Sequence, residues 1–116
     1  MELEDWNVVK VYVKYGKFSI GDEQAQYRLE AGSYSCTAGD SLAYHTSMAF
    51  STKNRDNDRD SSNCASRFTG AWWYNSCYYT NLNGLYTGNN HDGRGLRCYK
   101  FRDNLSLKFT EMKLRP

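Results

Sequence analysis

The sequence predicts a small, mostly β domain with little helix, and three observations lead to this prediction. Residues 8–20 alternate apolar and polar side chains, and residues 105–115 do so again. The 45 residues between them, 51–95, show little periodicity and are rich in Asn, Asp and Gly. Alternation with a period of two is typical of strands that bury one face. The 116 residues suffice for one domain or part of a larger one.

The first predicted strand is VVKVYVKYGKFSI, residues 8–20. One face would carry Val9, Val11, Val13 and Tyr15, and the other Lys10, Tyr12 and Lys14. Residues 27–30 can form a second strand, residues 32–40 read as a turn or loop, and residues 41–50 contain a short helical turn. In the final strand the apolar phase moves after Phe109, which indicates a bulge near Thr110 and Glu111.

Four cysteines, Cys36, Cys64, Cys77 and Cys98, allow three pairings. Their gaps of 28, 13 and 21 residues do not fit a zinc cluster, and neither histidine lies in a protease signature. An even number in a small chain indicates disulfides and an oxidising compartment, so we expect a secreted protein. The opening residues, MELED, are no signal peptide, so we expect further sequence before them in the full protein.

Charge and hydropathy exclude two classes of function. A formal charge of +2 does not favour nucleic acid binding, and no run reaches the ~18 apolar residues that a membrane span needs. The clustered cations are interpreted as a solvated basic loop, with contact to sulfated or sialylated glycans as the alternative; they are Arg94, Arg97, Lys100 and Arg102.

An acidic loop is the first candidate site. Asp56, Asp58 and Asp60 alternate in NRDNDRDSSNC, and carboxylates at this spacing suit a hard cation such as Ca²⁺. An EF-hand is excluded, because Ser61 replaces its glycine and Arg67 its final glutamate. The alternative is a solvated charge run compensated by neighbouring arginines.

Several other residues have a structural interpretation. Trp72 and Trp73 are expected in the core rather than as a sugar platform, and His45 is expected to be structural. Residues 81–84, NLNG, predict a turn whose amides satisfy backbone groups. Asn104 begins a glycosylation sequon within the predicted last strand.

The longer motifs together are more specific. The chain reads FSTKNRDNDRDSSNCA from Phe50, GAWWYNSC from Gly70, NLNGLY from Asn81, and TEMKLRP at the end, with ELEDWN, YRLEAGSY and TAGDSL upstream. It strongly resembles the second half of the fibrinogen C-terminal domain. This resemblance implies an α+β, mostly β fold: a twisted, mainly antiparallel sheet in residues 1–50, then a loop-rich region in residues 51–116 held by calcium and disulfides. We expect one partial domain.

The resemblance also implies site residues. Cys64 pairs with Cys77, and Ca²⁺ is held by the side chains of Asp56 and Asp58 and the backbone carbonyls of Asp60 and Ser62. The remaining cysteines, Cys36 and Cys98, replace a family glycine and tryptophan and are expected to form a second disulfide.

In lectin members of the family, a pocket beside the calcium binds acetyl groups. A cis peptide, here Ser76–Cys77, aims the N–H groups of Cys77 and Tyr78 at the acetyl carbonyl. Of the four aromatic walls only Phe68 is retained: Tyr78 replaces a histidine, and the other two positions fall at His91–Asp92 and at Asp103.

Two classes of function follow from the resemblance. The first is a calcium-dependent lectin that binds acetylated sugars or related glycans in innate pattern recognition. The second is an extracellular protein-interaction module with no sugar binding. An enzyme is not expected, because no nucleophile or general acid accompanies the aspartates. We also expect oligomerisation through segments outside this chain, and an unpaired edge on the strand at residues 8–15.

Overall fold

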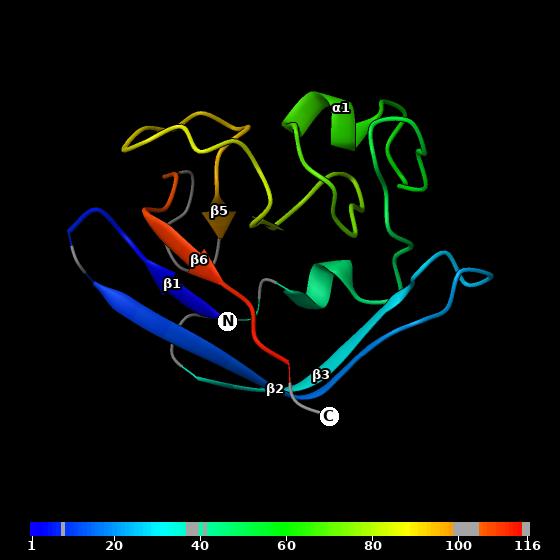
Figure 1. Cartoon of the computed structure of the whole chain (residues 1–116), viewed down its shortest axis with the longest axis horizontal. Helices are drawn as coiled ribbons and strands as arrows, with labels where there is room; N and C mark the ends of the chain where they lie inside the picture. The colour runs from blue at the N-terminus through cyan, green and yellow to red at the C-terminus, as the bar shows by residue number, and fades with distance from the viewer. Residues whose placement is uncertain (8, 37–39, 41, 99–104, 115–116) are drawn as a thin grey trace.

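The structure is a computed structural model that describes residues 1–7, 9–36, 40, 42–98 and 105–114, except the side chains at 35 and 36. A four-stranded sheet has the order β3-β2-β1-β6, and a two-stranded sheet pairs β4 with β5. Figure 1 shows the larger sheet along one side of the molecule, with α1 and the long loops on the other. The elements are β1 (Glu2–Glu4), β2 (Lys10–Ile20), β3 (Leu29–Cys36), η1 (Leu42–His45), α1 (Cys64–Phe68), β4 (Thr80–Asn81), β5 (Arg97–Cys98) and β6 (Phe109–Glu111).

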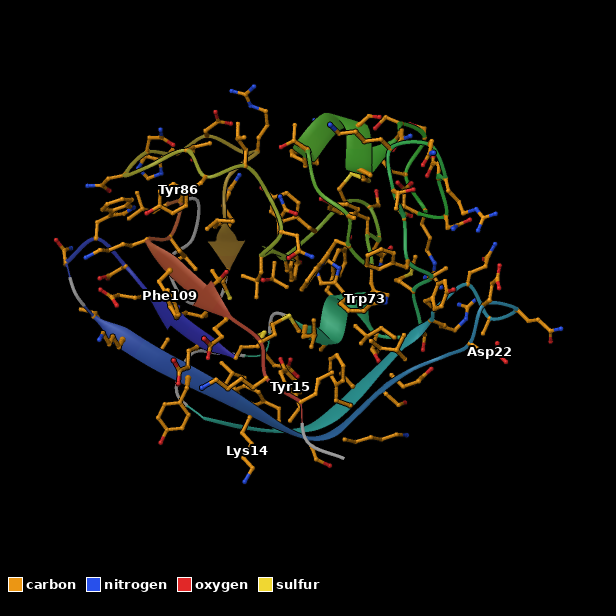
Figure 2. All side chains as sticks on the ribbon, viewed as in Figure 1. Lys14, Tyr15, Asp22, Trp73, Tyr86 and Phe109 are labelled. Atoms are coloured by element: carbon orange, nitrogen blue, oxygen red, sulfur yellow. A yellow bond between two sulfur atoms is a disulfide. The ribbon has the colours of Figure 1, made fainter. Side chains whose placement is uncertain are left out.

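Strand β2 confirms the predicted alternation from Val11 to Tyr15, whereas Val9, expected on the same face, precedes the strand and is exposed. Val13 is buried and Tyr15 half-buried, while Tyr12 and Lys14 are exposed. Figure 2 shows Tyr15 and Lys14 on opposite sides of β2. The phase changes at Gly16, where a Cβ would come within 2.8 Å of the Ser33 side chain on β3. The glycine therefore lets the two strands approach closely at this point.

Two boundaries differ from the sequence prediction. Strand β3 runs over Leu29–Cys36, so most of the predicted loop 32–40 is strand, paired antiparallel with β2. The turn lies earlier, where Gln26 and Tyr27 both have φ of 55°. The last strand is only Phe109–Glu111, since the preceding segment bonds elsewhere: the N–H of Leu107 donates to the Leu96 carbonyl. Composition alone did not show these long-range partners.

Strand β1 was not predicted, and its presence changes the edge of the sheet. It pairs with β2 along Lys10–Tyr12 and with β6 on its other side. The expected unpaired edge at residues 8–15 is therefore wrong for Lys10–Tyr12, which lie inside the sheet; residue 8 is outside the described part.

The core lies between the sheet and the loops. Trp72 and Trp73 are buried, as expected, and their rings meet at 5.0 Å between centroids. Phe18 of β2 packs its ring edge-on against Trp73, whose indole N–H donates to the Tyr27 carbonyl. The large fully buried apolar side chains around them are Leu3, Leu29, Leu42, Tyr74 and Leu107. This shared core fixes the loops relative to the sheet.

Candidate functional site

The acidic loop is a chain of backbone-to-carboxylate hydrogen bonds. Asp56 accepts the N–H of Asp58 at 3.3 Å, Asp58 that of Asp60 at 2.9 Å, and Asp60 that of Ser62 at 3.0 Å. The second oxygen of Asp58 accepts the N–H of Cys64 at 3.0 Å, where α1 begins. Such Asx turns coil the loop, so its carboxylates gather at one place.

The three aspartates have different environments. Burial, and then the nearby Asp56 carboxyl, raise the pKa of Asp58. By contrast, the hydroxyls of Ser62 and Ser76 donate to Asp60 and lower its pKa to about 2. Asp60 thereby ties the loop to Ser76, with 2.7 Å between the Ser76 hydroxyl and Asp60 Oδ1. Its side chain is engaged within the protein, which leaves its carbonyl as the group expected to bind a metal.

Asp56 and Asp58 fit a hard cation. Their carboxyl groups lie close enough to influence each other, and in the described part of the chain neither forms an ion pair with Lys or Arg. The alternative of a charge run compensated by Arg55 and Arg59 therefore has no ion pair to support it there. Two carboxylates and backbone carbonyls are the oxygen donors that Ca²⁺ prefers. Asp60, Cys64 and Cys77 also lie together, but the two sulfurs form a disulfide and cannot supply thiolate ligands.

The disulfide and the cis peptide implied by the resemblance are both present. Cys64 and Cys77 are bonded, and the peptide between Ser76 and Cys77 is cis. The carbonyl of Ser76 accepts the Tyr44 hydroxyl at 2.8 Å, while Asn75 donates its side-chain amide to the Tyr44 carbonyl. Residues 75–77 are thus anchored to η1 as well as to α1 and the acidic loop.

Two of the predicted pocket walls contact each other. The rings of Phe68 and Tyr78 meet edge to face, with 4.9 Å between centroids, which is ordinary ring contact. The Tyr78 hydroxyl donates to the Gly93 carbonyl at 2.7 Å. The Tyr78 side chain therefore occupies the space between the Phe68 ring and the backbone at Gly93.

Each wall also carries an arginine. The guanidinium of Arg67 lies 4.9 Å from the centre of the Phe68 ring, and that of Arg97 lies 5.4 Å from the Tyr78 ring. These cation–π contacts place positive charge on both rings. The Phe68, Tyr78, Arg67 and Arg97 side chains are called the aromatic–arginine surface below.

The other predicted site residues are distributed around it. Ser76 is exposed and faces the acidic loop. Asp92 lies near Tyr78 and binds Arg94 through two bonds, at 3.0 and 2.7 Å, which lowers the pKa of Asp92 to about 2. His91 is exposed, and Asp103 lies outside the described residues. The prediction thus brought Phe68, Tyr78 and Asp92 together. It did not name Arg67 as a site residue, and it named Arg97 only as part of a basic cluster.

His45 has a positioning role that the sequence did not reveal. Its Nδ1 donates to the Trp73 carbonyl at 2.8 Å, and its Nε2 accepts the N–H groups of Tyr79 and Thr80 at 3.1 and 3.2 Å. Since Nε2 accepts twice, the ring is the neutral Nδ1–H tautomer. Burial lowers the pKa of His45 to about 4. The ring therefore fixes the backbone immediately after Cys77 and Tyr78.

This fold and site define a mostly β domain whose long loops are held by a disulfide and an acidic loop, and comparison with known proteins identifies the family. The sequence matches the C-terminal globular domain of the fibrinogen beta and gamma chains over residues 1–116, and the chain belongs to that family. It is 48% identical to chicken (Gallus gallus) tenascin-R over 106 residues, which is 90% of this chain and 8% of tenascin-R. It is 51% identical to fibrinogen-like protein A of Apostichopus parvimensis over 90% of this chain and 38% of that protein.

Solved structures of fibrinogen-like domains have the same fold as this chain. The fibrinogen-like globe domain of human ANGPTL6 superposes with a TM-score of 0.86 at 39% identity, covering 92% of this chain and 50% of that one. Lamprey fibrin D-dimer, complexed with the peptide Gly-His-Arg-Pro-amide, superposes with a TM-score of 0.84 at 30% identity, covering 92% and 41%. The chain thus spans about half of these globular structures or less. Family membership supports an extracellular recognition module, and no described helix is long and apolar enough to cross a membrane.

Proposed function

We propose that this chain is a calcium-binding, non-catalytic recognition module of a secreted protein, and that it binds an acidic segment of an extracellular protein partner. The observation that carries this choice is the pair of guanidinium groups on the two aromatic walls, Arg67 on Phe68 and Arg97 on Tyr78. An arginine beside a partly exposed aromatic ring can bind a carboxylate through two parallel hydrogen bonds while the ring supplies apolar contact.

Charge argues against a ligand like the peptide in the fibrin complex. The lamprey fibrin peptide, Gly-His-Arg-Pro-amide, contains an arginine and is therefore cationic. Arg67 and Arg97 would repel a cationic peptide, although Asp92 near Arg97 offsets part of that charge. We therefore assign an anionic ligand to the aromatic–arginine surface, in place of the fibrin type of ligand.

The second candidate is an acetyl-binding lectin in innate pattern recognition. It is favoured by the cis peptide at Ser76–Cys77, which is the backbone arrangement that the lectin members use. Against it stands the contact between Phe68 and Tyr78, because an acetyl methyl would need space between these rings. A sugar could enter only if the Tyr78 side chain moved and gave up its bond to Gly93.

Calcium has a supporting role in the proposal. Asp56 and Asp58 would supply carboxylates, and Asp60 and Ser62 their carbonyls. Bound calcium would neutralise the two adjacent carboxyl groups. It would also hold the acidic loop against Ser76, which directly precedes the disulfide-bonded Cys77 and then Tyr78. Removing calcium should therefore weaken ligand binding while leaving the positions of Arg67 and Arg97 unchanged.

The test measures binding to three immobilised probes, each in Ca²⁺ and in EDTA. They are a glutamate-rich peptide, the same peptide with glutamine in place of glutamate, and an array of N-acetylated glycans. We expect calcium-dependent binding to the glutamate peptide, reduced at least about tenfold by Arg67→Gln. Arg55→Gln, an exposed arginine in the acidic loop region, is the matched control and should bind normally. Binding to acetylated glycans alone would favour the lectin, and equal binding to the glutamine peptide would contradict the proposal.

A further inference from the structure

The turn at residues 90–94 holds an acidic side chain next to the aromatic–arginine surface. The N–H of Asp92 donates to the Asn90 side chain at 3.1 Å, and the Asp92 carbonyl accepts the N–H of Gly95 at 3.0 Å. The next residue, Gly93, accepts the Tyr78 hydroxyl on its carbonyl at 2.7 Å. The backbone around Asp92 is therefore fixed against one wall of the surface.

Gly93 brings this turn close to the other groups of the surface as well. A Cβ at this position would lie 3.2 Å from Nη1 of Arg97 and 3.5 Å from the edge of the Phe68 ring. Because glycine has no side chain, residue 93 leaves the space between the Arg97 guanidinium and the Phe68 edge unfilled.

That space suits a carboxylate oxygen. A guanidinium nitrogen binds such an oxygen at about 2.8 Å, and the edge of an aromatic ring is the positive part of its quadrupole. An oxygen beside Gly93 would therefore meet Arg97 Nη1 and the Phe68 edge together. A guanidinium has five N–H donors, so Arg97 can bind the oxygen while it stays over the Tyr78 ring.

The protein carries a carboxylate of its own next to this space. Asp92 directly precedes Gly93, and its pKa is lowered to about 2, mainly by hydrogen bonds from Arg94 and to a smaller extent by the charge of Arg97. Asp92 is thus within electrostatic reach of Arg97. Turned towards Arg97, its side chain would enter the space beside Gly93 and compete with an anionic ligand.

Arg94 holds the Asp92 side chain in another direction. The backbone N–H of Arg94 donates to Oδ1 of Asp92 at 2.9 Å, its Nε donates to Oδ1 at 3.0 Å, and its Nη2 donates to Oδ2 at 2.7 Å. One residue therefore engages both carboxylate oxygens in a bidentate pair. Since an exposed ion pair stabilises a fold little, this pair matters for where the carboxylate points.

We propose that Arg94 is a positioning residue for the aromatic–arginine surface: by holding Asp92, it keeps that carboxylate from Arg97, so that Arg97 binds the carboxylate of the ligand beside Gly93. This inference rests on the proposed function, because it takes the ligand to be an acidic segment. Arg94 acts here without touching the ligand. A direct contact between Arg94 and the ligand is the competing explanation, and the first experiment separates the two.

The first experiment measures binding of the glutamate-rich peptide in Ca²⁺ to four proteins: the wild type, Arg94→Gln, Asp92→Asn and the double variant. Arg94→Gln should lower the affinity at least about fivefold, and the double variant should bind to within about twofold of Asp92→Asn. Arg55→Gln, which removes another exposed arginine, should bind like the wild type. The proposal is overturned if Arg94→Gln has no effect, or if it weakens binding equally with and without Asp92→Asn.

A second binding measurement tests the place of the ligand carboxylate. Gly93→Ala puts a methyl group between Arg97 Nη1 and the Phe68 edge, so it should lower the affinity for the glutamate-rich peptide. Gly32→Ala on β3 is the matched control, because its Cβ would meet nothing within 4 Å. If both alanine variants bind as tightly as the wild type, the ligand does not bind beside Gly93.

The last experiment needs no ligand and follows the side-chain N–H signals of Arg97 by NMR near neutral pH. In Arg94→Gln the released Asp92 carboxylate should shift these signals, and adding Asp92→Asn should return them to their wild-type positions. The Arg67 signals are the internal control and should stay unchanged in all variants. Arg97 signals that do not move in Arg94→Gln, or that move equally in the double variant, would overturn the restraint of Asp92. If the wild type does not bind the glutamate-rich peptide, the proposed function is wrong, and these signals still decide whether Arg94 restrains Asp92.

Discussion

The carboxylate of Asp58 accepts the backbone N–H of Cys64 at 3.0 Å. It also accepts the N–H of Asp60, so Asp58 organises the loop even without a metal. We predict that Asp58→Ala lowers the free energy of unfolding in EDTA by about 1–3 kcal/mol, because two N–H groups lose a charged acceptor. It should also abolish any rise in Tm on adding Ca²⁺.

Asp56→Ala separates the two roles of this loop. Asp56 is exposed and accepts one long bond, so its loss should change stability in EDTA little but should remove the response to Ca²⁺. Glu23→Ala, an exposed glutamate in the turn before β3, is the control and should keep that response. Thermal melts of the four proteins in EDTA and in excess Ca²⁺ decide the matter. Identical wild-type melts in the two buffers would show that the loop binds no calcium.

Acidification should destabilise the protein through His45. Its pKa is lowered to about 4 from 6.5, so between these values the unfolded chain binds more protons than the folded one. The stability that neutral His45 contributes is therefore complete above pH 6.5 and is lost as the pH falls towards 4. The loss amounts to about 3 kcal/mol.

Denaturant titrations from pH 7 to pH 4 measure this effect. His45→Gln should be less stable at pH 7 and should show a flatter dependence on pH over this window. His91→Gln, at an exposed position, is the matched control and should follow the wild type. A wild-type profile that stays level between pH 6.5 and 4.5 would rule out the buried neutral ring.

The difference between His45 and β2 shows what could be predicted from sequence. β2 was predictable because Val11, Val13 and Tyr15 repeat every two residues and turn one face to the core. The role of His45 was not, because its partners lie 28 to 35 residues away and are backbone atoms of any residue type. β1 was missed for a related reason: three residues are too short for a pattern, and pairing with β2 and β6 makes them a strand.

Some features of the candidate site could likewise be predicted from local motifs, whereas others depend on contacts that only folding makes. The acidic loop and the Cys64–Cys77 pair lie in local motifs, so the resemblance could transfer them position by position. The closure of the pocket depends on where one side chain points, with the Tyr78 hydroxyl reaching Gly93, and no local pattern encodes that. The aromatic–arginine surface likewise needs folding to bring Phe68 against Tyr78, each with its arginine.

Asn81 should be among the most sensitive polar positions. The NLNG motif behaves as predicted: the side-chain carbonyl of Asn81 accepts the Tyr74 hydroxyl at 2.7 Å, and its amide donates to the Phe68 and Gly95 carbonyls. All of Asn81 is buried. Asn81→Ala should cost about 2–3 kcal/mol, because the buried Tyr74 hydroxyl loses its partner.

Asn83→Ala is the matched control for that change. Asn83 is exposed and makes one bond, to the Ala71 carbonyl at 3.0 Å, so its loss should cost about 0.5–1 kcal/mol. Urea denaturation of both variants gives the comparison. If both variants lost the same free energy of unfolding, the buried Asn81 amide would stabilise the protein no more than the exposed Asn83 amide does.

The last prediction is a second disulfide between Cys36 and Cys98. Cys98 is fully buried in β5, which pairs with β4. Cys36 ends β3 opposite Val13, two residues from Tyr15 on β2, although its side chain lies outside the described part. Closing this long loop would stabilise the fold by about 4 kcal/mol in the chain-entropy treatment.

Non-reducing peptide mapping tests the pairing directly, with the Cys64–Cys77 peptide as its internal control. A Cys36–Cys98 peptide is expected, and no thiol should react after denaturation. Cys36→Ala and Cys98→Ala should each lower Tm, and the double variant should lose no more than either alone, because one bond is broken in all three. Two reactive thiols, or a peptide that joins Cys36 to Cys64, would contradict the pairing.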